Sequence, residues 1–565
     1  MTDTHGTPTR GTTFNLGDLF DTVARALPDR VAIVHGDTRV SYGQLRQRTD
    51  GLAAALRRRG IGRGDRLGLL MHNTPGHLIA LLAAFKTGVI PFNLNYRYER
   101  DELGQILDDA EPTAVIHTDR YGPTLRDLRR SVPGMRLLIP DDTERESATQ
   151  TTNSRRDHAP EALSTLYTEP PGREDITSGR CGDDVLILYT GGTTGLPKGV
   201  EWSHKALFFA ALGGGATYGG APVAAPVAAP DEMADRAAAV PPASLLTLAP
   251  LMHGAGMWTA LIALLNGACL VLSASRSLDG EAVWDLIEKE AVVSLSITGN
   301  SMAAPLIAAW DAHPERWHAS SLAAVSWGGA PMSEHYRNAL RTRLPAIRLL
   351  SGMGSTESGA SATVDLAAAS DGLLSIAPKP DLAVLTEDGR FARPGELGIL
   401  ARTGPLPNGY WRDPKRTADT FITVEDRRWV LTGDYASVGE DGRITFYGRG
   451  STCINTGGEK VYPEEVENVL RAHPAIHDVV VVGAPDERWG EAVTAVAVLQ
   501  PGRRLGLDDL RAFCDGRLAR YKLPARLVLT DAVKRSPAGK ADVRWARAIA
   551  VEQQPRAEEK DPHSA

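Results

Sequence analysis

Residues 189 to 200 read YTGGTTGLPKGV, a run of glycine and threonine with one charged side chain, that of Lys198. The apolar residues from Val185 to Tyr189 are typical of a buried strand, and Ser203 is a suitable N-cap for a following helix. Such a loop between a strand and a helix lets backbone N–H groups and hydroxyls face an anion. The stretch therefore predicts a phosphate-binding loop in an α/β protein.

This loop differs from the common P-loop. Lys198 is followed by Gly199, where that motif requires a Ser or Thr for magnesium. A flexible turn without a ligand is the alternative interpretation. The hydroxyls of Thr190, Thr193 and Thr194 argue against it, because a mere turn does not need them.

Length and composition limit the possible classes of protein. A chain of 565 residues is too long for one ordinary hydrophobic core, which predicts two or more domains. Its net charge of −7 is spread through the sequence, which favours a small-molecule partner over nucleic acid or an anionic membrane. The four cysteines are far apart, so we expect neither a zinc site nor a disulfide framework, and a reducing cytoplasm fits best.

No segment predicts membrane insertion. The first residues are polar and lack the apolar core of a signal peptide. The longest apolar region, residues 257–273, is interrupted at Asn266 and Gly267. It therefore predicts a helix followed by a strand and no integral membrane association.

Helical and strand patterns alternate along the chain, as in residues 42–60 followed by 65–71. This alternation predicts an α/β architecture with largely parallel sheets. Residues 141–182 are polar and residues 213–243 are rich in Ala, Gly and Pro, so we expect both to be surface insertions. The charged end, residues 549–565, is expected to be a disordered tail.

Five further motifs point to one family. They are WGGAP (327–331), GMGSTE (352–357), LTGDYA (431–436), YGRGSTCINTGGEKVYPEEVE (447–467) and SPAGK (536–540). Together with the loop, and in this order, they resemble the acyl-adenylate-forming superfamily of acyl-CoA synthetases, luciferases and peptide-synthetase adenylation domains. The resemblance implies a large N-terminal domain of sandwiched sheets and helices, residues 1–448, and a small mobile C-terminal α/β domain, residues 449–548.

The resemblance also implies a reaction with ATP, Mg²⁺ and coenzyme A. A carboxylate attacks the α-phosphate of ATP, pyrophosphate leaves, and the thiol of CoA then opens the acyl-AMP. Because two anions must meet, catalysis consists mainly of positioning and charge neutralisation. The residues that the family would use for the β- and γ-phosphates are Thr190, Gly191, Gly192, Thr193, Thr194, Gly195 and Lys198.

Further roles follow from the same resemblance. Glu357 would be the magnesium ligand and Thr356 would contact the α-phosphate, although a carboxylate at a helix start is the alternative for Glu357. Asp434 would accept both ribose hydroxyls, and Arg449 would donate to the ribose or phosphate side; an Asp after Gly is otherwise a turn residue. The candidates on the adenine side and in the adjoining motif are Gly328, Gly329, Ala330, Gly352, Met353 and Gly354.

The last motifs belong to the two half-reactions. Lys540 would bridge the substrate carboxylate and the α-phosphate, and Gly458 would line the pantetheine channel. The small domain would rotate between the two steps. Ser451 departs from the family, which usually has Asp or Lys at this hinge, so thioester formation is less strongly implied than adenylation.

The segment PLMHGAGMW, residues 250–258, resembles the part of the family that lines the acyl pocket, with His253 beside the reacting carboxylate. A buried structural histidine is the equal alternative. Leu251, Met252, Met257 and Trp258 surround it without an acidic residue, which favours a lipophilic acid over an amino acid. A fatty, steroid or bulky terpenoid or polycyclic acid is expected.

Three other functions share parts of this pattern. A stand-alone adenylating enzyme would pass acyl-AMP to a carrier protein or a separate ligase, and a luciferase-like oxygenase would consume oxygen. A silent nucleotide-binding protein would be expected to lack Lys540 or Glu357, and both are present. An AMP-forming acid–CoA ligase is therefore preferred, and a homodimer is compatible with the sequence.

Overall fold

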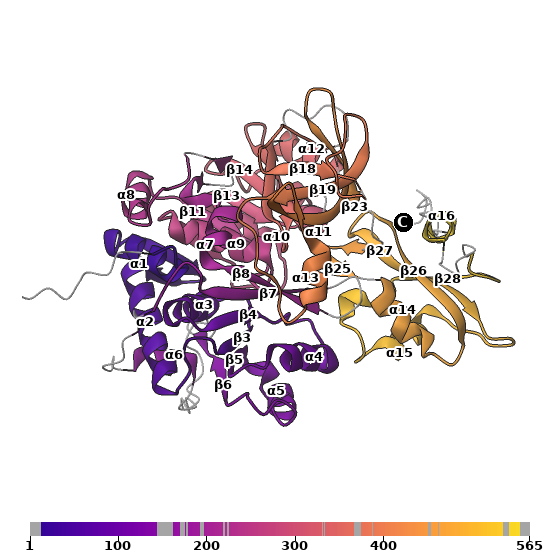
Figure 1. The fold of residues 1–565 in the computed structure, drawn as a ribbon, viewed down its shortest axis with the longest axis horizontal. Coiled ribbons are helices and arrows are strands. Elements are labelled where there is room, and N and C mark those ends of the chain that lie inside the picture. Colours follow the sequence, from indigo (N-terminus) through magenta and orange to yellow (C-terminus); the bar gives the residue numbers. More distant parts are fainter. Residues whose placement is uncertain are drawn as a thin grey trace, which may run out of the picture. The chain divides into compact units, whose positions relative to one another are not determined.

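The chain forms two compact units, as seen in a computed structural model (Figure 1). Unit 1 comprises Met1–Tyr96, Leu103–Thr190 and Lys198–Gly448; unit 2 comprises Arg97–Glu102, Gly191–Pro197 and Arg449–Ala565. The structure describes residues 13–143, 162–169, 176, 179–191, 197–218, 221–222, 225–329, 332, 334–365, 374–386, 388–449, 454–461, 463–534 and 542–553. Several residues named above lie outside these ranges: Gly192, Thr193, Thr194, Gly195, Ala330, Ser451 and Lys540.

The largest sheet of unit 1 has the strand order β16-β15-β14-β13-β11-β12-β1-β2. Its neighbours from β15 to β1 pair in parallel, and the two outermost strands pair antiparallel. Its strands are β1 (Val31–His35), β2 (Thr38–Ser41), β11 (Ser244–Thr247), β12 (Cys269–Leu272), β13 (Val292–Ile297), β14 (Ala324–Trp327), β15 (Arg348–Ser355) and β16 (Gly359–Asp365).

The second sheet of unit 1 has the order β20-β8-β7-β4-β3-β5-β6 and is parallel from β7 to β6. Its strands are β3 (Arg66–Leu70), β4 (Ile90–Asn93), β5 (Ala114–Thr118), β6 (Leu137–Asp141), β7 (Val185–Gly191), β8 (Pro197–Ser203) and β20 (Gly409–Tyr410). The parallel sheets expected from the alternating pattern are thus confirmed for these two.

A third sheet corrects that expectation in part, because its pairs are antiparallel. An antiparallel pair can be joined by a short turn and needs no crossover helix. They are β17 (Leu374–Ile376), β18 (Leu382–Leu385), β19 (Leu397–Thr403), β21 (Phe421–Val424), β22 (Arg427–Val438) and β23 (Ile444–Arg449).

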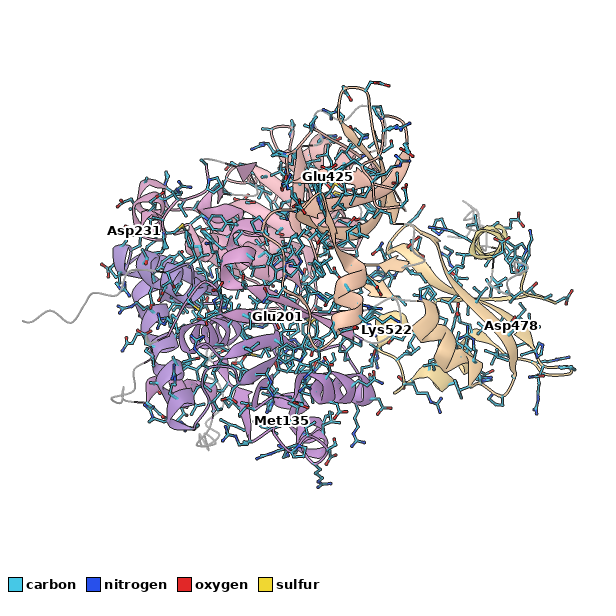
Figure 2. The ribbon with its side chains drawn as sticks, in the orientation of Figure 1. Met135, Glu201, Asp231, Glu425, Asp478 and Lys522 are labelled. Carbon is cyan, nitrogen blue, oxygen red and sulfur yellow. The ribbon has the colours of Figure 1, made fainter. Side chains whose placement is uncertain are left out.

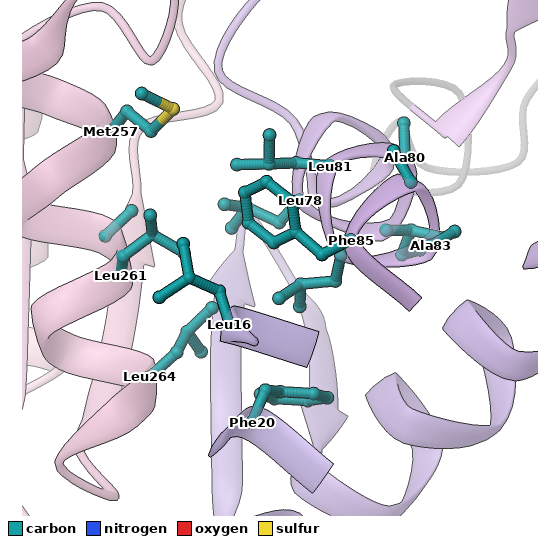
Figure 3. Packing of buried hydrophobic residues seen from close by; sticks show 14 of the residues in the cluster. Leu16, Phe20, Leu78, Ala80, Leu81, Ala83, Phe85, Met257, Leu261 and Leu264 are labelled. Carbon is teal, nitrogen blue, oxygen red and sulfur yellow. The ribbon is translucent and has the colours of Figure 1, made fainter. Parts of the chain in front are cut away.

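Helix α3 (Pro75–Thr87) lies at the centre of the largest core. All of its residues are buried, which fits a helix that is apolar on every side. Figure 3 shows its side chains packed against α1 (Leu16–Ala26) and α9 (Gly254–Leu265). The other helices of unit 1 include α2 (Tyr42–Arg58), α4 (Arg100–Ala110), α5 (Gly122–Leu128), α7 (His204–Ala210), α10 (Gly280–Lys289), α11 (Gly299–Ala312), α12 (Glu334–Arg343) and α13 (Pro414–Thr420).

The two expected surface insertions contribute to this core. The first contains α6 (Leu163–Thr168), which packs on α2, and the second contains α8 (Glu232–Ala239), which packs on α1. The second also contains the short pair β9 (Thr217–Tyr218) and β10 (Ala221–Pro222). Composition alone missed these contacts because single apolar residues, such as the buried Met233, supply them.

Unit 2 has an α/β core of its own. Its strands are β24 (Ile454–Thr456), β25 (Glu459–Val461), β26 (Ile476–Asp486), β27 (Gly490–Leu499) and β28 (Arg526–Leu529). Its helices are α14 (Pro463–Arg471), α15 (Leu507–Cys514) and α16 (Val543–Glu552), so the chain is helical beyond the predicted start of the tail at residue 549.

The apolar region 257–273 folds as predicted, because α9 ends at Leu265 and β12 begins at Cys269. Among the described residues, no helix combines the length and the apolar character needed to cross a membrane.

The sheets and helices of the two units confirm the fold class as α/β with a large unit and a smaller one.

Candidate functional site

The carboxyl ends of neighbouring parallel strands bring several predicted residues to one edge of the largest sheet. Strands β11, β13, β14 and β15 pair in parallel, so the segments that leave them lie on the same side. His253 follows β11, Gly328 follows β14, and Glu357 follows β15. Topology thus gathers groups that are far apart in the sequence.

Two positions at this edge, 354 and 329, are glycine for different physical reasons. A Cβ at Gly354 would lie 2.1 Å from the carbonyl oxygen of Gly359, so the β15–β16 hairpin itself requires glycine there. Gly329 has φ +82°, and no heavy atom of the described residues lies within 4 Å of the position that a Cβ would take. Its open surroundings suit the approach of a flat ligand, whereas Gly354 has a sufficient structural explanation.

The two ends of the predicted phosphate-binding loop belong to the second sheet. Thr190 is the penultimate residue of β7, and Lys198 lies at the start of β8. The Lys198 ammonium is 3.3 Å from Oδ2 of Asp413, which caps α13. The loop's cation is therefore already held beside a carboxylate.

A second contact connects β8 to the edge of the largest sheet. Trp202 on β8 donates from its indole Nε1 to the main-chain oxygen of Thr356 at 2.8 Å. The same strand carries Glu201, labelled in Figure 2. The strand that carries Lys198 is thus hydrogen-bonded to the segment that carries Glu357.

Glu357 is half-buried and accepts a hydrogen bond at Oε1 from the hydroxyl of Tyr410, at 3.1 Å. Burial, together with the charge of Glu357, raises the pKa of Tyr410 well above its usual value. The phenol therefore stays protonated and acts as the donor. Sequence reasoning missed Tyr410, because a tyrosine after glycine carries no signal of a partner from another sheet.

The surroundings of Glu357 fit a magnesium ion that is shared with a nucleotide. The described residues contain no group of three or more His, Cys, Asp or Glu side chains that could hold a metal alone. Mg²⁺ commonly takes one or two carboxylates and completes its shell with phosphate oxygens and water. A single glutamate, with its carboxylate near β8 through Tyr410, matches that donor set.

Buried hydrogen bonds hold the main chain on both sides of Glu357 in place. The hydroxyl of Ser355 donates to that of Ser358 at 3.1 Å, and Arg402 donates to the main-chain oxygens of Ser358 and Ala210. Arg402 is buried, and this burial lowers its pKa. The segment is therefore held by backbone and hydroxyl contacts that do not use the Glu357 carboxylate.

Asn93 connects the exit of β7 to the expected acyl segment. Its side-chain amide accepts from the N–H of Tyr189 at 2.7 Å and donates to the carbonyls of Tyr189 and Met252 at 3.1 and 2.7 Å. Tyr189 also donates from its hydroxyl to Asp109 at 2.5 Å. One buried amide thus fixes the start of the phosphate loop relative to the neighbourhood of His253.

His253 occupies the N-cap position of α9, but its side chain does not cap the helix. It is half-buried, together with Trp258. The indole Nε1 of Trp258 is buried and has no hydrogen-bond partner among the described residues. The apolar character expected for this segment holds for Leu251, Met252 and Met257, which are buried.

The ribose candidates lie on the third sheet. Asp434 is half-buried on β22, and its N–H donates to the hydroxyl of Thr432 at 3.2 Å. Gly433 before it has φ +76°, which is consistent with the turn alternative. Arg449 ends β23.

Gly458 lies in unit 2, in the tight turn between β24 and β25. Gly457 and Gly458 have φ of +59° and +89°, so both positions of a two-residue hairpin turn favour glycine. The main-chain oxygen of Trp489 accepts from the N–H of Gly457 at 2.8 Å. The turn thus explains Gly458 without a ligand, and the channel role remains a prediction.

Comparison with known proteins identifies the class. The AMP-binding enzyme family matches residues 20–411, and the AMP-binding enzyme C-terminal domain matches residues 465–540. The chain therefore belongs to the AMP-binding enzyme family, the acyl-adenylate-forming superfamily indicated by its motifs.

Relatives of nearly full length are acid–CoA ligases by name. A medium-chain acyl-CoA ligase of Mycobacterium avium is 38% identical, with 96% of this chain and 99% of the relative covered. A 3-oxocholest-4-en-26-oate–CoA ligase of Rhodococcus rhodochrous is 35% identical, with 94% and 95% covered. An amide bond synthetase of Marinactinospora thermotolerans superposes with a TM-score of 0.76 at 25% identity, covering 94% of this chain and 99% of the other.

Proposed function

We propose that this protein is an AMP-forming acid–CoA ligase. It activates a lipophilic carboxylic acid with ATP to acyl-AMP, releases pyrophosphate, and transfers the acyl group to coenzyme A. The observation that carries this proposal is the match over almost the whole chain to acyl-CoA ligases, combined with a phosphate loop whose lysine and neighbouring glutamate are both fixed in unit 1.

The family resemblance implies distinct roles for the charged groups. Lys198 and the loop amides would neutralise the β- and γ-phosphates, and Thr356 would contact the α-phosphate. Mg²⁺ supplies charge neutralisation on the phosphate oxygens when bound, and Glu357 would hold it. Asp434 and Arg449 would bind the ribose side, with Gly328 and Gly329 against adenine. Lys540 would bring the carboxylate to the α-phosphate.

The acid is proposed to be a fatty acid or a steroid side-chain acid. Relatives from Mycobacterium tuberculosis and Rhodococcus rhodochrous are named for 3-oxocholest-4-en-26-oate, and the former also for medium- and long-chain fatty acids. The segment around His253 offers apolar side chains and no carboxylate to receive an amino group. A bulky apolar acid gains most from such a surface.

The partners, the cellular location, the oligomeric state and the domain boundaries are also part of the proposal. The substrates are small molecules, so neither nucleic acid nor a membrane is needed for the reaction. A cytoplasmic location fits the cysteine spacing, and a homodimer is compatible with the chain. Residues 1–448 are proposed as the adenylation domain and residues 449–548 as the mobile domain.

The test is pyrophosphate release with ATP and magnesium across fatty, aromatic, steroid and diterpenoid acids, each with and without CoA, with products identified by mass. We expect acyl-CoA and AMP with the fatty or steroid acids. Pyrophosphate and acyl-AMP without acyl-CoA would instead identify an adenylating enzyme with another acceptor, and an added amine would test amide formation. No pyrophosphate with any acid would overturn the proposal.

A further inference from the structure

Tyr410 is held in place by β8, the strand that carries Lys198. Strand β20 pairs antiparallel with β8, with Gly409 opposite Glu201 and Tyr410 opposite Val200. After it, the N–H of Trp411 donates to the carbonyl of Gly199 at 2.8 Å. The main chain of Tyr410 is therefore held in register with β8.

The ring of Tyr410 is fixed as well. It packs edge-on against Phe421, with ring centroids 6.1 Å apart, and the guanidinium of Arg416 lies 5.7 Å from its centroid. The main-chain N–H of Tyr410 donates to the hydroxyl of Thr417 at 2.9 Å. These contacts come from α13 and β21, and they hold the ring and the main chain of Tyr410 without involving Glu357.

The Glu357 carboxylate depends on that hydroxyl. Among the described residues, Tyr410 is the one partner that bonds this carboxylate, at Oε1, and no ion pair to it is formed. A glutamate side chain has several rotatable bonds, so an unheld carboxylate would sample many positions. The hydrogen bond selects one and leaves Oε2 for another ligand.

We propose that Tyr410 is a positioning residue that orients Glu357 toward the magnesium ion bound with ATP. Hydrogen bonds to a metal-ligating carboxylate fix its orientation and so raise metal affinity. Because β8 carries both the pairing with Tyr410 and the side chain of Lys198, one strand sets the relative positions of the two charged groups that face the phosphates. The inference rests on the proposed metal role of Glu357.

The test replaces Tyr410 by Phe, which keeps the ring and removes the hydroxyl. The full-length enzyme is mixed with an ATP analogue that has a methylene group between the α- and β-phosphorus atoms, and Mn²⁺ binding is measured by electron paramagnetic resonance. We expect the Mn²⁺ dissociation constant of Tyr410→Phe to rise about tenfold. The affinity for the analogue without metal should not change.

Tyr42→Phe is the matched control. It also removes a buried tyrosine hydroxyl, which donates to the carbonyl of Ala268 at 2.7 Å, far from the site in sequence and within the core. It is expected to lower the melting temperature while leaving the Mn²⁺ dissociation constant unchanged. An equal change in both variants would assign the effect of Tyr410→Phe to general loosening and overturn the inference.

Glu357→Gln separates the inference from the proposed function. If Glu357→Gln weakens Mn²⁺ binding and Tyr410→Phe does not, Glu357 binds metal without help from Tyr410, and the positioning role is overturned alone. If Glu357→Gln binds Mn²⁺ like the wild type, both the metal assignment and the inference fail. Weakening in both variants, without weakening in Tyr42→Phe, supports the positioning role.

Discussion

At the scale of single residues, two charged groups of the candidate site are each held by a partner. Lys198 lies beside Asp413, and Glu357 accepts from Tyr410. The carboxylate of Asp413 also caps α13 through the N–H of Arg416, and this backbone hydrogen bond, followed by the effect of Lys198, lowers its pKa. The negative charge beside Lys198 is therefore fixed independently of the lysine.

Lys540 is expected to serve only the first half-reaction. Lys540→Ala should reduce acyl-AMP formation to near background, because no other cation is implied to bridge the two anions. The same variant should still convert supplied acyl-AMP and CoA to acyl-CoA. Separate assays of pyrophosphate release and thiolysis measure the two steps, and adenylation at a near wild-type rate would remove the assignment.

Gly458 allows a test with an internal control, because the neighbouring Gly457 also has a positive φ that disfavours a side chain. Gly458→Ala and Gly457→Ala both place a side chain at positive φ, which costs about 1–2 kcal/mol each. If Gly458 lines the pantetheine channel, Gly458→Ala should slow thioester formation much more than Gly457→Ala, while both retain adenylation. Equal losses from the two variants would mean that the hairpin turn, and not a channel, explains the glycine.

At the scale of elements, buried charge joins the helices that pack around α3. The Lys86 ammonium on α3 lies 2.7 Å from Asp21 on α1 and 2.6 Å from Asp50 on α2. Arg180 lies 3.1 Å from the same Asp21. Burial alone would raise the pKa of Asp21, but the attraction of Lys86 and Arg180 outweighs it and lowers the pKa.

Lys86→Met should therefore destabilise unit 1, by about 3–5 kcal/mol, because it leaves a buried carboxylate short of a cation. Because folding depresses the pKa of Asp21, its stabilising effect is present above the unfolded pKa of about 3.9 and is lost as the pH falls through the folded value. Without Lys86 the folded pKa of Asp21 rises, so the difference in stability between the variant and the wild type should shrink as the pH falls and Asp21 is protonated. Urea unfolding at several pH values measures this, and an unchanged midpoint would show that Arg180 suffices.

At the scale of the whole molecule, the chain has two units with separate hydrophobic cores. The catalytic cycle proposed from the family resemblance needs rotation of the small domain about residues near Ser451. That residue lies outside the described ranges, so the hinge rests on the sequence alone. If the small domain rotates about this hinge, a change at the hinge should alter the rates of the two half-reactions to different extents.

Ser451→Pro should restrict this rotation, because proline fixes φ near −65°. We expect one half-reaction to persist, with adenylation retained and thioester formation reduced at least tenfold, a loss of about 1.4 kcal/mol in transition-state stabilisation. Single-turnover assays of each step give the comparison, and Ser451→Ala is the control for loss of the hydroxyl. Equal effects on both steps would place the hinge elsewhere.

The sequence by itself determined the α/β class and the superfamily, because glycine-rich loops and ordered motifs are local patterns, and its choice of polar residues for the site stays a prediction. It could not determine that residues 213–243 contribute to the core, or that the third sheet is antiparallel. It also gave no sign of Tyr410, Asn93 or Arg402. Only the tertiary structure decided these contacts, because hydrogen bonding and burial depend on which distant segments meet, and no local periodicity records that.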